Sequence, residues 1–245
     1  MNFARDARHG LRLLLRSPGF TLMAVLALAV GVGANITIFG FVNATLLRPV
    51  DAAEPERLIR AYPNGSDPVA TIPYEDYEEY RDRNQSLSSL AMFHWGGIKA
   101  VRVNGSTEMI HVMPVTGNYF EALGVRAALG RAIVERDDDL AAGGVVVLSD
   151  EGWRRHFSAD PNVLGQTIFI GKQAFTIVGV APPWFRGTIG APVVPQIYFP
   201  WNGPLGRFPG GHLIGRLKPG VSRGEAQADL SRIATHLTAE RHRDI

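Results

Sequence analysis

The distribution of hydrophobic and polar residues sets the first fifty positions apart from the rest of the chain. Phe20–Leu47 is a run of 28 residues without a single Asp, Glu, Lys or Arg. An α-helix rises about 1.5 Å per residue and a bilayer core is about 30 Å thick, so roughly 20 apolar residues suffice to cross it. The run therefore predicts a transmembrane helix over residues 20–47, in preference to a buried core helix.

A cleaved signal peptide is the main alternative for this run. Phe20–Val30 would be its apolar region, and Val32–Ala34 has the small residues of a cleavage site. The apolar pattern continues to Leu47, however, and a mature secreted protein is not expected to begin with such a segment. An uncleaved anchor is the favoured interpretation.

Small and polar residues inside the run suggest that it contacts another helix. Ala27 and Gly31 are four residues apart, as are Ala29 and Gly33, and this spacing lets a second helix approach closely in lipid. Asn35 is polar and is expected to face a partner helix or water. We predict helix packing at Ala27, Gly31, Gly33 and Asn35, although a single anchor would also tolerate these residues.

The segment before the run, residues 1–19, has the pattern of an amphipathic helix at the cytoplasmic surface of the membrane. Its basic residues are predicted to lie at the membrane interface: Arg5, Arg8, Arg12 and Arg16. Translocating this short cationic tail is unfavourable, so residues 48–245 are expected outside the cytoplasm. Arg48, Arg57 and Arg60 follow the run, which reduces the charge margin to one residue.

Residues 48–245 alternate between strand-like and helix-like patterns without strict order, which favours the α+β class. Asn104–Gly105 is the preferred pair for a type I′ hairpin turn, and Ser222 with Glu225 forms a capping box before the last helix. The expected strands cover residues 57–62, 90–95, 99–103, 106–112, 145–148, 166–170, 174–180, 196–200 and 213–217. The expected helices cover residues 73–84, 118–124 and 149–157 and a C-terminal segment after residue 222.

Composition narrows the function. The chain has 46% apolar residues, no cysteine and a net charge of +2. The chain has 25 basic and 23 acidic residues, and residues 1–16 hold four of the basic and one of the acidic residues. The remaining residues therefore carry 21 basic and 22 acidic side chains. The folded body is thus not basic, which argues against a nucleic-acid-binding domain. The cationic tail beside an apolar run suits a membrane surface.

Motifs for nucleotide and metal binding are weak. The only Gly-Lys pair, Gly171–Lys172, is followed by Gln173 in an expected hairpin, so it is not a P-loop. Asp137–Asp139 after Glu135 is a possible divalent-cation site, but such runs are more often solvated loops. The seven histidines show no zinc-binding spacing. We therefore expect no cofactor-binding and no metal-binding residues.

A hydrolase is equally weakly supported. Ser149–Asp150 with His156 contains the residue types of a catalytic triad, yet Ser149 fits a helix cap and no G-x-S-x-G turn surrounds it. The four tryptophans are better explained as core residues than as a ligand pocket. We expect no catalytic residues and do not expect the chain to be an enzyme.

Several segments together carry a resemblance to a known family. They include "ARHGLRLLLRSPGFTLMAVLALAVGVGAN", "PYEDYEEYRDRNQSLSSLAMF", "MPVTGNYFEALGVRAALGR", "VVVLSDEGWRRHFSADPNVLGQTIFIGKQAFTIVGVAPPWFRG" and "GRLKPGVSRGEAQADL". In this order they resemble MacB-like ABC transporter permeases, in particular the acidobacterial duplicated orphan permease branch. The resemblance covers most of the chain.

This resemblance implies an inner-membrane permease whose first span precedes a periplasmic core domain. That domain is expected to contain porter-like β-α-β units with a smaller inserted subdomain. The resemblance also implies a separate or fused ABC ATPase subunit, whose ATP-driven motion is transmitted to the periplasm, and it supplies no catalytic residues. Most of the chain is then periplasmic, with the membrane and an ATPase as partners and no nucleic acid.

The chain departs from the family in one respect, because family permeases carry three further spans in an FtsX-like domain after this core. We interpret it as the N-terminal part of a permease, whose partners include further permease spans or a second permease copy. The alternative is a membrane-anchored periplasmic binding or scaffold module without transport of its own.

Overall fold

The computed structural model describes residues 18–42, 52–62, 70–139, 143–188, 194–205, 208 and 210–241. The chain divides into two compact units. One contains the N-terminal helix and the other contains the folded body from residue 49 onward, apart from residues 190–192. Each unit is described here by itself.

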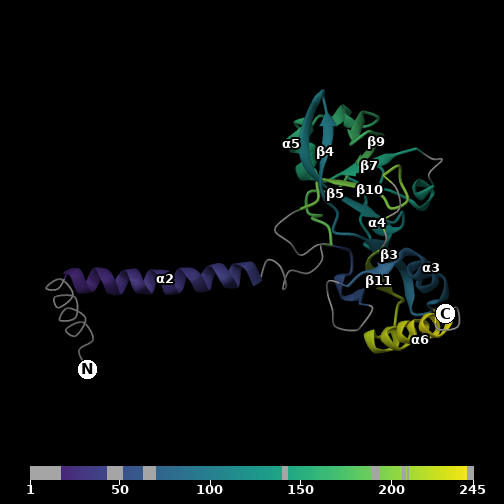
Figure 1. Ribbon diagram of the computed structural model, residues 1–245, viewed down its shortest axis with the longest axis horizontal. Coiled ribbons are helices and arrows are strands. Elements are labelled where there is room, and N and C mark those ends of the chain that lie inside the picture. The colour runs from purple at the N-terminus through teal and green to yellow at the C-terminus, as the bar shows by residue number, and fades with distance from the viewer. Residues whose placement is uncertain are drawn as a thin grey trace. The chain divides into compact units, whose positions relative to one another are not determined.

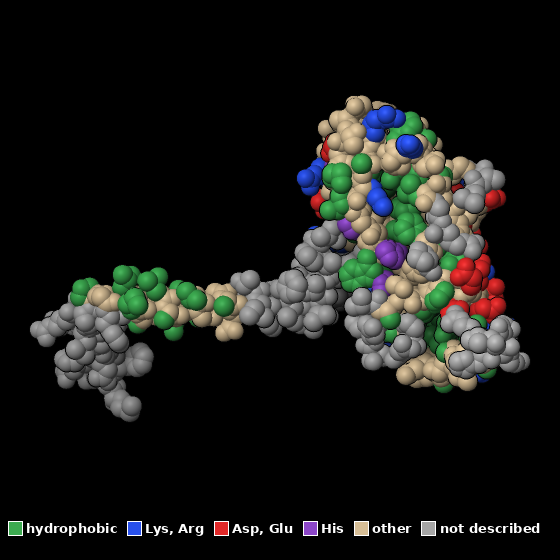
Figure 2. Space-filling view, in the orientation of Figure 1, with side chains coloured by type: hydrophobic (Ala, Val, Ile, Leu, Met, Phe, Trp, Pro, Cys, Tyr) green, Lys and Arg blue, Asp and Glu red, His purple; other side chains and the backbone are tan. Residues whose placement is uncertain are grey.

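The first unit contains helix α2, Pro18–Val42, with 25 residues. Figure 2 shows its described side chains as hydrophobic or neutral. Large apolar side chains are exposed along it, with Leu28 and Val30 at 71% and 70% exposure. None of the helices in the described residues combines the length and the hydropathy needed to cross a membrane. The span that the sequence predicts over residues 20–47 stays a prediction, and its last five residues lie outside the described ranges.

The body contains one mixed sheet with helices against it (Figure 1). Its path runs β1-β11-β3-β5-β10-β7-β9-β8-β4, with β2 paired to β11 and β6 paired to β9. The strands are β1 Leu58–Ala61, β2 Ile72–Pro73, β3 Leu87–Phe93, β4 Gly97–Val103, β5 Ser106–Val115, β6 Leu129–Gly130, β7 Val145–Leu148, β8 Thr167–Ile170, β9 Gln173–Val180, β10 Ile197–Pro200 and β11 Gly210–Leu217. The α-helices are α3 Tyr74–Arg83, α4 Tyr119–Ala122, α5 Asp150–Phe157 and α6 Arg223–Arg241, and the 3-10 helices are η2 Pro55–Arg57, η3 Glu135–Asp138 and η5 Pro161–Val163.

Strands β1, β11 and β3 form a split β-α-β unit with α3. Strands β1 and β3 both pair antiparallel with β11, so they run parallel to each other with β11 between them. Helix α3 presents Tyr74, Tyr77 and Tyr80 to the core because residues three apart share a helix face. Helix α6 adds Ala226 and Ile233, both fully buried, to the same hydrophobic cluster.

The predicted start of α6 is confirmed. The Ser222 backbone N–H donates to Glu225 Oε2 over 2.7 Å, and the Glu225 N–H donates to Ser222 Oγ over 3.2 Å. These reciprocal bonds form the capping box that the sequence predicted and satisfy amides that a helix start leaves without partners.

A second hydrophobic core lies inside a closed ring of strands. The ring runs β5-β10-β7-β9-β8-β4, and β4 pairs back with β5 over its whole length. Inward side chains from all six strands meet there, and Phe157 of α5 joins them. The hairpin between β4 and β5 turns at Asn104 and Gly105, with φ of 50° and 83°, as the predicted type I′ turn requires.

Strand β5 links the strand ring to the β1-β11-β3 half of the sheet, because it lies between β3 and β10. Its first seven residues pair with β4, and Val112–Val115 pairs in parallel with β10. Its last residue, Val115, also pairs with Phe93 of β3. The two halves of the sheet therefore share one continuous strand.

Most of the predicted elements are confirmed, with shifted boundaries. The strand expected from residue 90 begins at Leu87, and the one expected from residue 213 begins at Gly210. The sequence predicted a β-α-β start, but it did not predict that the C-terminal strand β11 lies between β1 and β3. Pairings between residues more than a hundred positions apart leave no trace in local periodicity.

Two glycines with positive φ allow a test of the close packing beside β5. Gly96 has φ +68°, and a Cβ there would lie 1.8 Å from the Val112 carbonyl oxygen. Gly105 has φ +83°, but a Cβ there would meet nothing within 4 Å. We expect Gly105→Ala to lower the free energy of unfolding by about 1 kcal/mol, from backbone strain alone. Gly96→Ala should lower it by about 3 kcal/mol or more, because a backbone clash is added.

Thermal unfolding of the two purified variants, compared with the parent chain, measures this difference. Gly105→Ala is the matched control, since it introduces the same methyl group at a similar φ. Equal losses of Tm in the two variants would contradict the packing described for Gly96.

Candidate functional site

The connecting segment, residues 52–57, directly precedes strand β1 of the body. Both polar backbone groups of Ala53, the N–H and the carbonyl, are hydrogen-bonded. The Ala53 N–H donates to the Leu123 carbonyl over 3.1 Å, and Arg216 Nη2 donates to the Ala53 carbonyl over 2.7 Å. Both backbone groups of this residue are thus bonded to the body.

Arg216 lies on β11 and connects three parts of the chain. Its Nε donates to the Ala122 carbonyl at the end of α4 over 2.8 Å, in addition to the bond to Ala53. Nη1 lies 3.7 Å from Glu54 Oε2, and the side chain is only 12% exposed. Carbonyls at the end of a helix lack partners within it and carry partial negative charge, so a cation is well placed there.

The burial of Arg216 has an electrostatic cost. Loss of solvent lowers the pKa of its guanidinium, and the nearby Arg57 lowers this pKa further. Glu54 and Glu56 act in the opposite direction. The positive charge is therefore held by its carbonyl and carboxylate partners rather than by water.

Arg57 fixes the other end of the connecting segment. Its Nε and Nη2 both donate to the Leu217 carbonyl, over 3.1 Å and 2.7 Å, and its Nη1 pairs with Glu54. We call Ala53, Glu54, Arg57 and Arg216 the arginine clasp. The clasp ties the connecting segment to the last two residues of β11 and to α4.

The clasp also depends on a close backbone approach. Gly124 has φ +66°, and a Cβ there would lie 2.7 Å from the Ala53 Cβ. Only glycine fits both the left-handed backbone and this contact. The sequence indicated Gly124 as a helix end, and the structure adds a second reason for it.

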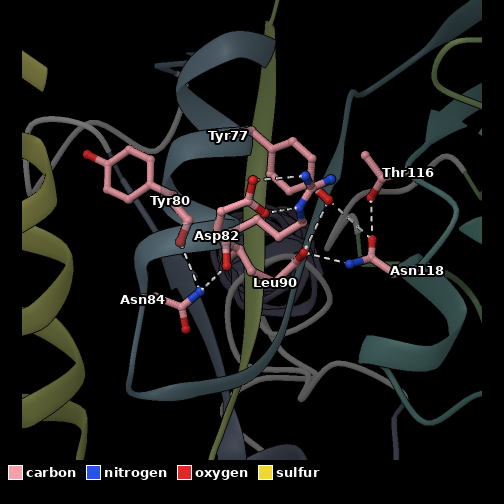
Figure 3. A network of polar contacts seen from close by, with 8 residues as sticks. Tyr77, Tyr80, Asp82, Asn84, Leu90, Thr116 and Asn118 are labelled. Carbon is pink, nitrogen blue, oxygen red and sulfur yellow. Dashed lines mark hydrogen bonds and ion pairs between the residues drawn. The ribbon is translucent and has the colours of Figure 1, made fainter.

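A buried polar network joins β3, α3 and the start of α4 (Figure 3). Asn118 Nδ2 donates to the Leu90 carbonyl over 2.8 Å, and the Thr116 hydroxyl donates to Asn118 Oδ1 over 2.8 Å. The Tyr77 hydroxyl lies 3.3 Å from the Leu90 carbonyl. Burial and hydrogen bonding hold these groups in one arrangement, since an unpartnered polar group there would be costly.

Thr116 closes the pairing between β3 and β5. Its N–H donates to the Met92 carbonyl over 2.9 Å, and the Met92 N–H donates to Thr116 Oγ1 over 2.9 Å. The strands themselves share only the Phe93–Val115 pair. The seam between the strand ring and the β1-β11-β3 half of the sheet is thus narrow, and the Thr116 hydroxyl extends it.

The structure describes only some of the residues that the sequence predicted to contact the membrane or another helix within it. Arg5, Arg8, Arg12 and Arg16 lie outside the described residues. Ala27, Gly31, Gly33 and Asn35 lie on exposed positions of α2. A helix turns about 100° per residue, so Ala27, Gly31 and Asn35 share one face whereas Gly33 lies about 200° away from Gly31. The predicted packing positions therefore form one face of three residues and a separate one at Gly33.

The weaker catalytic alternative does not assemble in the structure. The Ser149 hydroxyl accepts the Gly152 N–H over 3.1 Å, as a helix cap does. The His156 ring contacts Glu108 and Gln196 at 2.8 Å and 3.2 Å. Asp150 pairs with Arg154, so all three residues of the candidate triad are engaged elsewhere, and the cap interpretation of Ser149 is confirmed.

The tryptophans are dispersed. Trp201 is fully buried in the core beside α3, and Trp153 packs against the core of the strand ring. Trp95 and Trp184 are 40% and 51% exposed. The core interpretation holds for the first two and not for the exposed pair.

Sequence reasoning missed the clasp. Arg216 was noted only as part of an expected strand, although a basic residue inside the apolar stretch "HLIGRL" was a usable signal. Ala53 carries no such signal, because its partners Leu123 and Arg216 lie more than 60 residues away.

The fold and the clasp define a mixed α/β domain that follows an apolar N-terminal helix and is tied to the intervening segment. The chain matches the MacB-like periplasmic core domain family over residues 21–233. It belongs to that family, as the resemblance in its sequence indicated.

Individual relatives are more distant. The chain is 29% identical over 147 residues to the macrolide export ATP-binding/permease protein MacB 1/2 of Paracoccus denitrificans, covering 60% of this chain and 22% of that protein. It is 27% identical over 119 residues to the MacB protein of Aggregatibacter actinomycetemcomitans, covering 49% and 18%. The matched region thus spans about a fifth of the length of these relatives.

Solved structures share the fold. The periplasmic region of MacB from Actinobacillus actinomycetemcomitans has a TM-score of 0.57 at 18% identity, covering 74% of this chain and 82% of that one. The extracellular domain of the noncanonic ABC-type transporter YknZ from Gram-positive bacteria has a TM-score of 0.54 at 15% identity, covering 72% and 86%. At these identities the likeness concerns the fold alone.

The clasp can be tested by removing only the guanidinium of Arg216. Arg216→Met keeps an unbranched apolar side chain but loses the bonds to Ala53 and Ala122. We expect a loss of about 1.5–3 kcal/mol in the free energy of unfolding, the range for hydrogen bonds to charged groups, together with faster proteolysis within residues 52–57.

Arg154→Met is the matched control, because its guanidinium pairs with Asp150 at 60% exposure on α5. Exposed pairs of this kind contribute little, so proteolysis of the connecting segment should not change in the control. Unchanged cleavage in Arg216→Met would mean that the clasp does not hold the segment.

Proposed function

We propose that the chain is the N-terminal part of the permease of a MacB-like ABC transporter. The observation that carries this proposal is the family match over residues 21–233, which begins inside the uncharged run. In this role the body transmits motion that an ABC ATPase subunit generates by hydrolysing ATP. The names of the relatives, which describe ATP-binding/permease proteins, support the partnership.

The proposed topology has three parts. Residues 1–19 lie at the cytoplasmic surface, residues 20–47 cross the bacterial inner membrane, and residues 48–245 form the periplasmic core domain. The 28 uncharged residues of the run support the crossing, and the four arginines before it support the orientation. Helix α2, Pro18–Val42, covers most of this run.

The proposed mechanism uses the arginine clasp and the seam. A displacement of the chain at residue 52 would be passed to β11 and α4 by the clasp, because Ala53 is bonded on both its N–H and its carbonyl. Strand β11 pairs with β3 over most of its length, and β3 connects to the ring through the seam. We equate the ring with the smaller inserted subdomain and the β1-β11-β3 half with the porter-like part.

The second candidate function is a membrane-anchored periplasmic binding or scaffold module without transport of its own. The exposed Trp95 and Trp184, with Ile98 and Met109, favour contacts with another molecule. The coding sequence after Ile245 distinguishes the two candidates. Continuation into further spans supports the permease, and a stop codon supports the module.

Topology is tested by fusing alkaline phosphatase to Ile245 in one version of the chain and a fluorescent protein in another. We expect active phosphatase and a dark fluorescent protein, since the first folds in the periplasm and the second does not when it is exported through the general secretory route. The control replaces Val25 and Leu28 with arginine, which raises the cost of insertion by several kcal/mol. A fluorescent fusion of the unaltered chain would contradict the topology.

Helix contact in the membrane is tested at Gly31. Gly31→Leu should leave insertion intact, because leucine is more apolar, but it should reduce association with further spans or with a second copy. A bulky side chain separates backbones whose contact lipid does not replace. Gly33→Leu tests the second face, and Val32→Leu, which lies about 100° from both glycines, is a control for nonspecific effects.

Co-purification of differently tagged copies, and of a co-expressed ATPase subunit, gives the measurement. Association that persists in both glycine variants would make α2 a plain tether, and the scaffold candidate would gain support.

A further inference from the structure

Strand β1 forms an open edge of the sheet. It lies at one end of the strand path, and β11 is the one strand that pairs with it within the described residues. A strand at an edge carries backbone N–H and carbonyl groups on its outer side, and a further chain can pair with them.

The turn before β1 determines which residues of the strand point to this edge. The Leu58 N–H donates to the Pro55 carbonyl, so it faces away from β11. Residues of an antiparallel strand alternate between facing their partner strand and facing away from it. Arg60 therefore turns its N–H and its carbonyl to the open edge, where neither group has a backbone partner among the described residues.

A cavity of about 480 Å³ runs along this edge. Residues 58–62, which follow one another in the chain, all line it. Side chains of a strand alternate between the two faces of a sheet, so a lining of consecutive residues means that the cavity follows the backbone edge and not one face. A second cavity of about 390 Å³ is also lined by the consecutive residues Leu58, Ile59 and Arg60.

Helix α6 forms the opposite wall of the larger cavity. Its lining residues share one face of the helix, because residues three and four positions apart are neighbours: Arg223, Gln227, Leu230, Ser231 and Ala234. Apolar and aromatic side chains complete the lining at Ile72, Tyr80 and Leu213. The larger cavity is thus a groove between an open strand and a helix, which we call the edge groove.

The edge groove is cationic. Arg60 and Arg223 are the charged residues on its described lining. Arg223 is exposed, and its Nη2 reaches only the Glu56 carbonyl, over 3.4 Å. The Arg60 guanidinium lies 5.5 Å from the centre of the Phe93 ring, and its Nε and Nη2 have no hydrogen-bond partner. The field at the groove therefore favours an acidic group, and Arg223 is the cation that such a group can reach.

We propose that the edge groove binds an extended segment of a partner polypeptide, which pairs with β1 as an added strand. The Arg60 N–H and carbonyl supply main-chain hydrogen bonds, and the apolar lining takes alternate side chains of the segment. Arg223 pairs with an acidic side chain of the same segment. The inference goes beyond the proposed permease role and does not depend on it.

A second copy of this chain fits the edge less well. Strand β1 has four residues, so pairing with the same strand of another copy would bring the two Arg60 residues within a few positions of each other. Like charges at neighbouring positions of paired strands are destabilising. A small apolar ligand would fill the groove but would leave the Arg60 backbone groups without partners.

Fluorescence anisotropy with the full-length chain in lipid nanodiscs tests the proposal. The labelled probe is a short peptide in which valine alternates with threonine and one threonine is replaced by glutamate. A second probe carries lysine in place of the glutamate. We expect saturable binding of the glutamate probe and an affinity at least about tenfold lower for the lysine probe, because Arg223 repels it.

Two further probes test the strand pairing itself. Each is the glutamate probe with N-methyl groups on one of its two alternate sets of amides. Only one set faces β1 in an added strand, so one version should lose at least about tenfold in affinity because its donors are gone. The other version is the matched control and should bind as the unmodified probe does.

Arg223→Glu locates the acidic contact. This variant should bind the glutamate probe about tenfold more weakly and the lysine probe more tightly than the parent chain does, an exchange that a structural role of Arg223 would not produce. Residue 223 lies at the start of α6, where a glutamate is favourable for the helix. Arg155→Glu changes an exposed arginine of α5 outside both linings and should bind both probes as the parent does.

Hydrogen exchange at the Arg60 amide gives a readout that needs no variant. It should slow at least about tenfold on saturation with the glutamate probe, because the amide gains a partner. Equal affinities for the glutamate and lysine probes, equal affinities for the two N-methylated probes, or unchanged exchange at Arg60 would each overturn the proposal. Protection of Arg60 that rises with the concentration of the chain alone would identify a second copy as the occupant and would overturn it as well.

Discussion

The structure of the body depends on one strand, β5, which joins the strand ring to the β1-β11-β3 half of the sheet. Its first part closes the strand ring against β4, and its end pairs with β10 and touches β3 at Phe93–Val115. A single backbone pair is a weak connection, so the hydrogen bonds of Thr116 and Asn118 are what make the seam specific. Because β5 is one continuous strand, a displacement of either half of the sheet changes the geometry at this seam.

The arginine clasp fixes the chain to the body at Ala53, before the first strand. Arg216 bonds the connecting segment, the end of α4 and β11 at once, so these three parts move together as long as the clasp is closed. A tether would need none of these contacts, since a flexible chain joins an anchor to a domain without bonding to it. The clasp therefore supports the proposed role, in which position, and not mere attachment, would be passed from the proposed membrane span to the core domain.

The sequence predicted what depends on neighbouring residues. The turn at Asn104–Gly105 and the cap at Ser149 were confirmed because their partners lie within three residues. The place of β11 between β1 and β3 and the closure of the ring were not predicted, since they depend on pairings across most of the chain. The clasp was missed for the same reason, as Arg216 and Ala53 are 163 positions apart. The family resemblance supplied the domain type, which no local pattern contained.

Hydrogen exchange at the Ala53 amide of the full-length chain tests the central claim most directly. This N–H bonds to the Leu123 carbonyl, and amides that open only with the surrounding structure exchange as slowly as those of the core. The account predicts protection of Ala53 close to that of Ile214 in the middle of β11. Exchange of Ala53 at the rate of an unstructured segment, with Ile214 still protected, would show that the connecting segment is a free tether and would contradict the account.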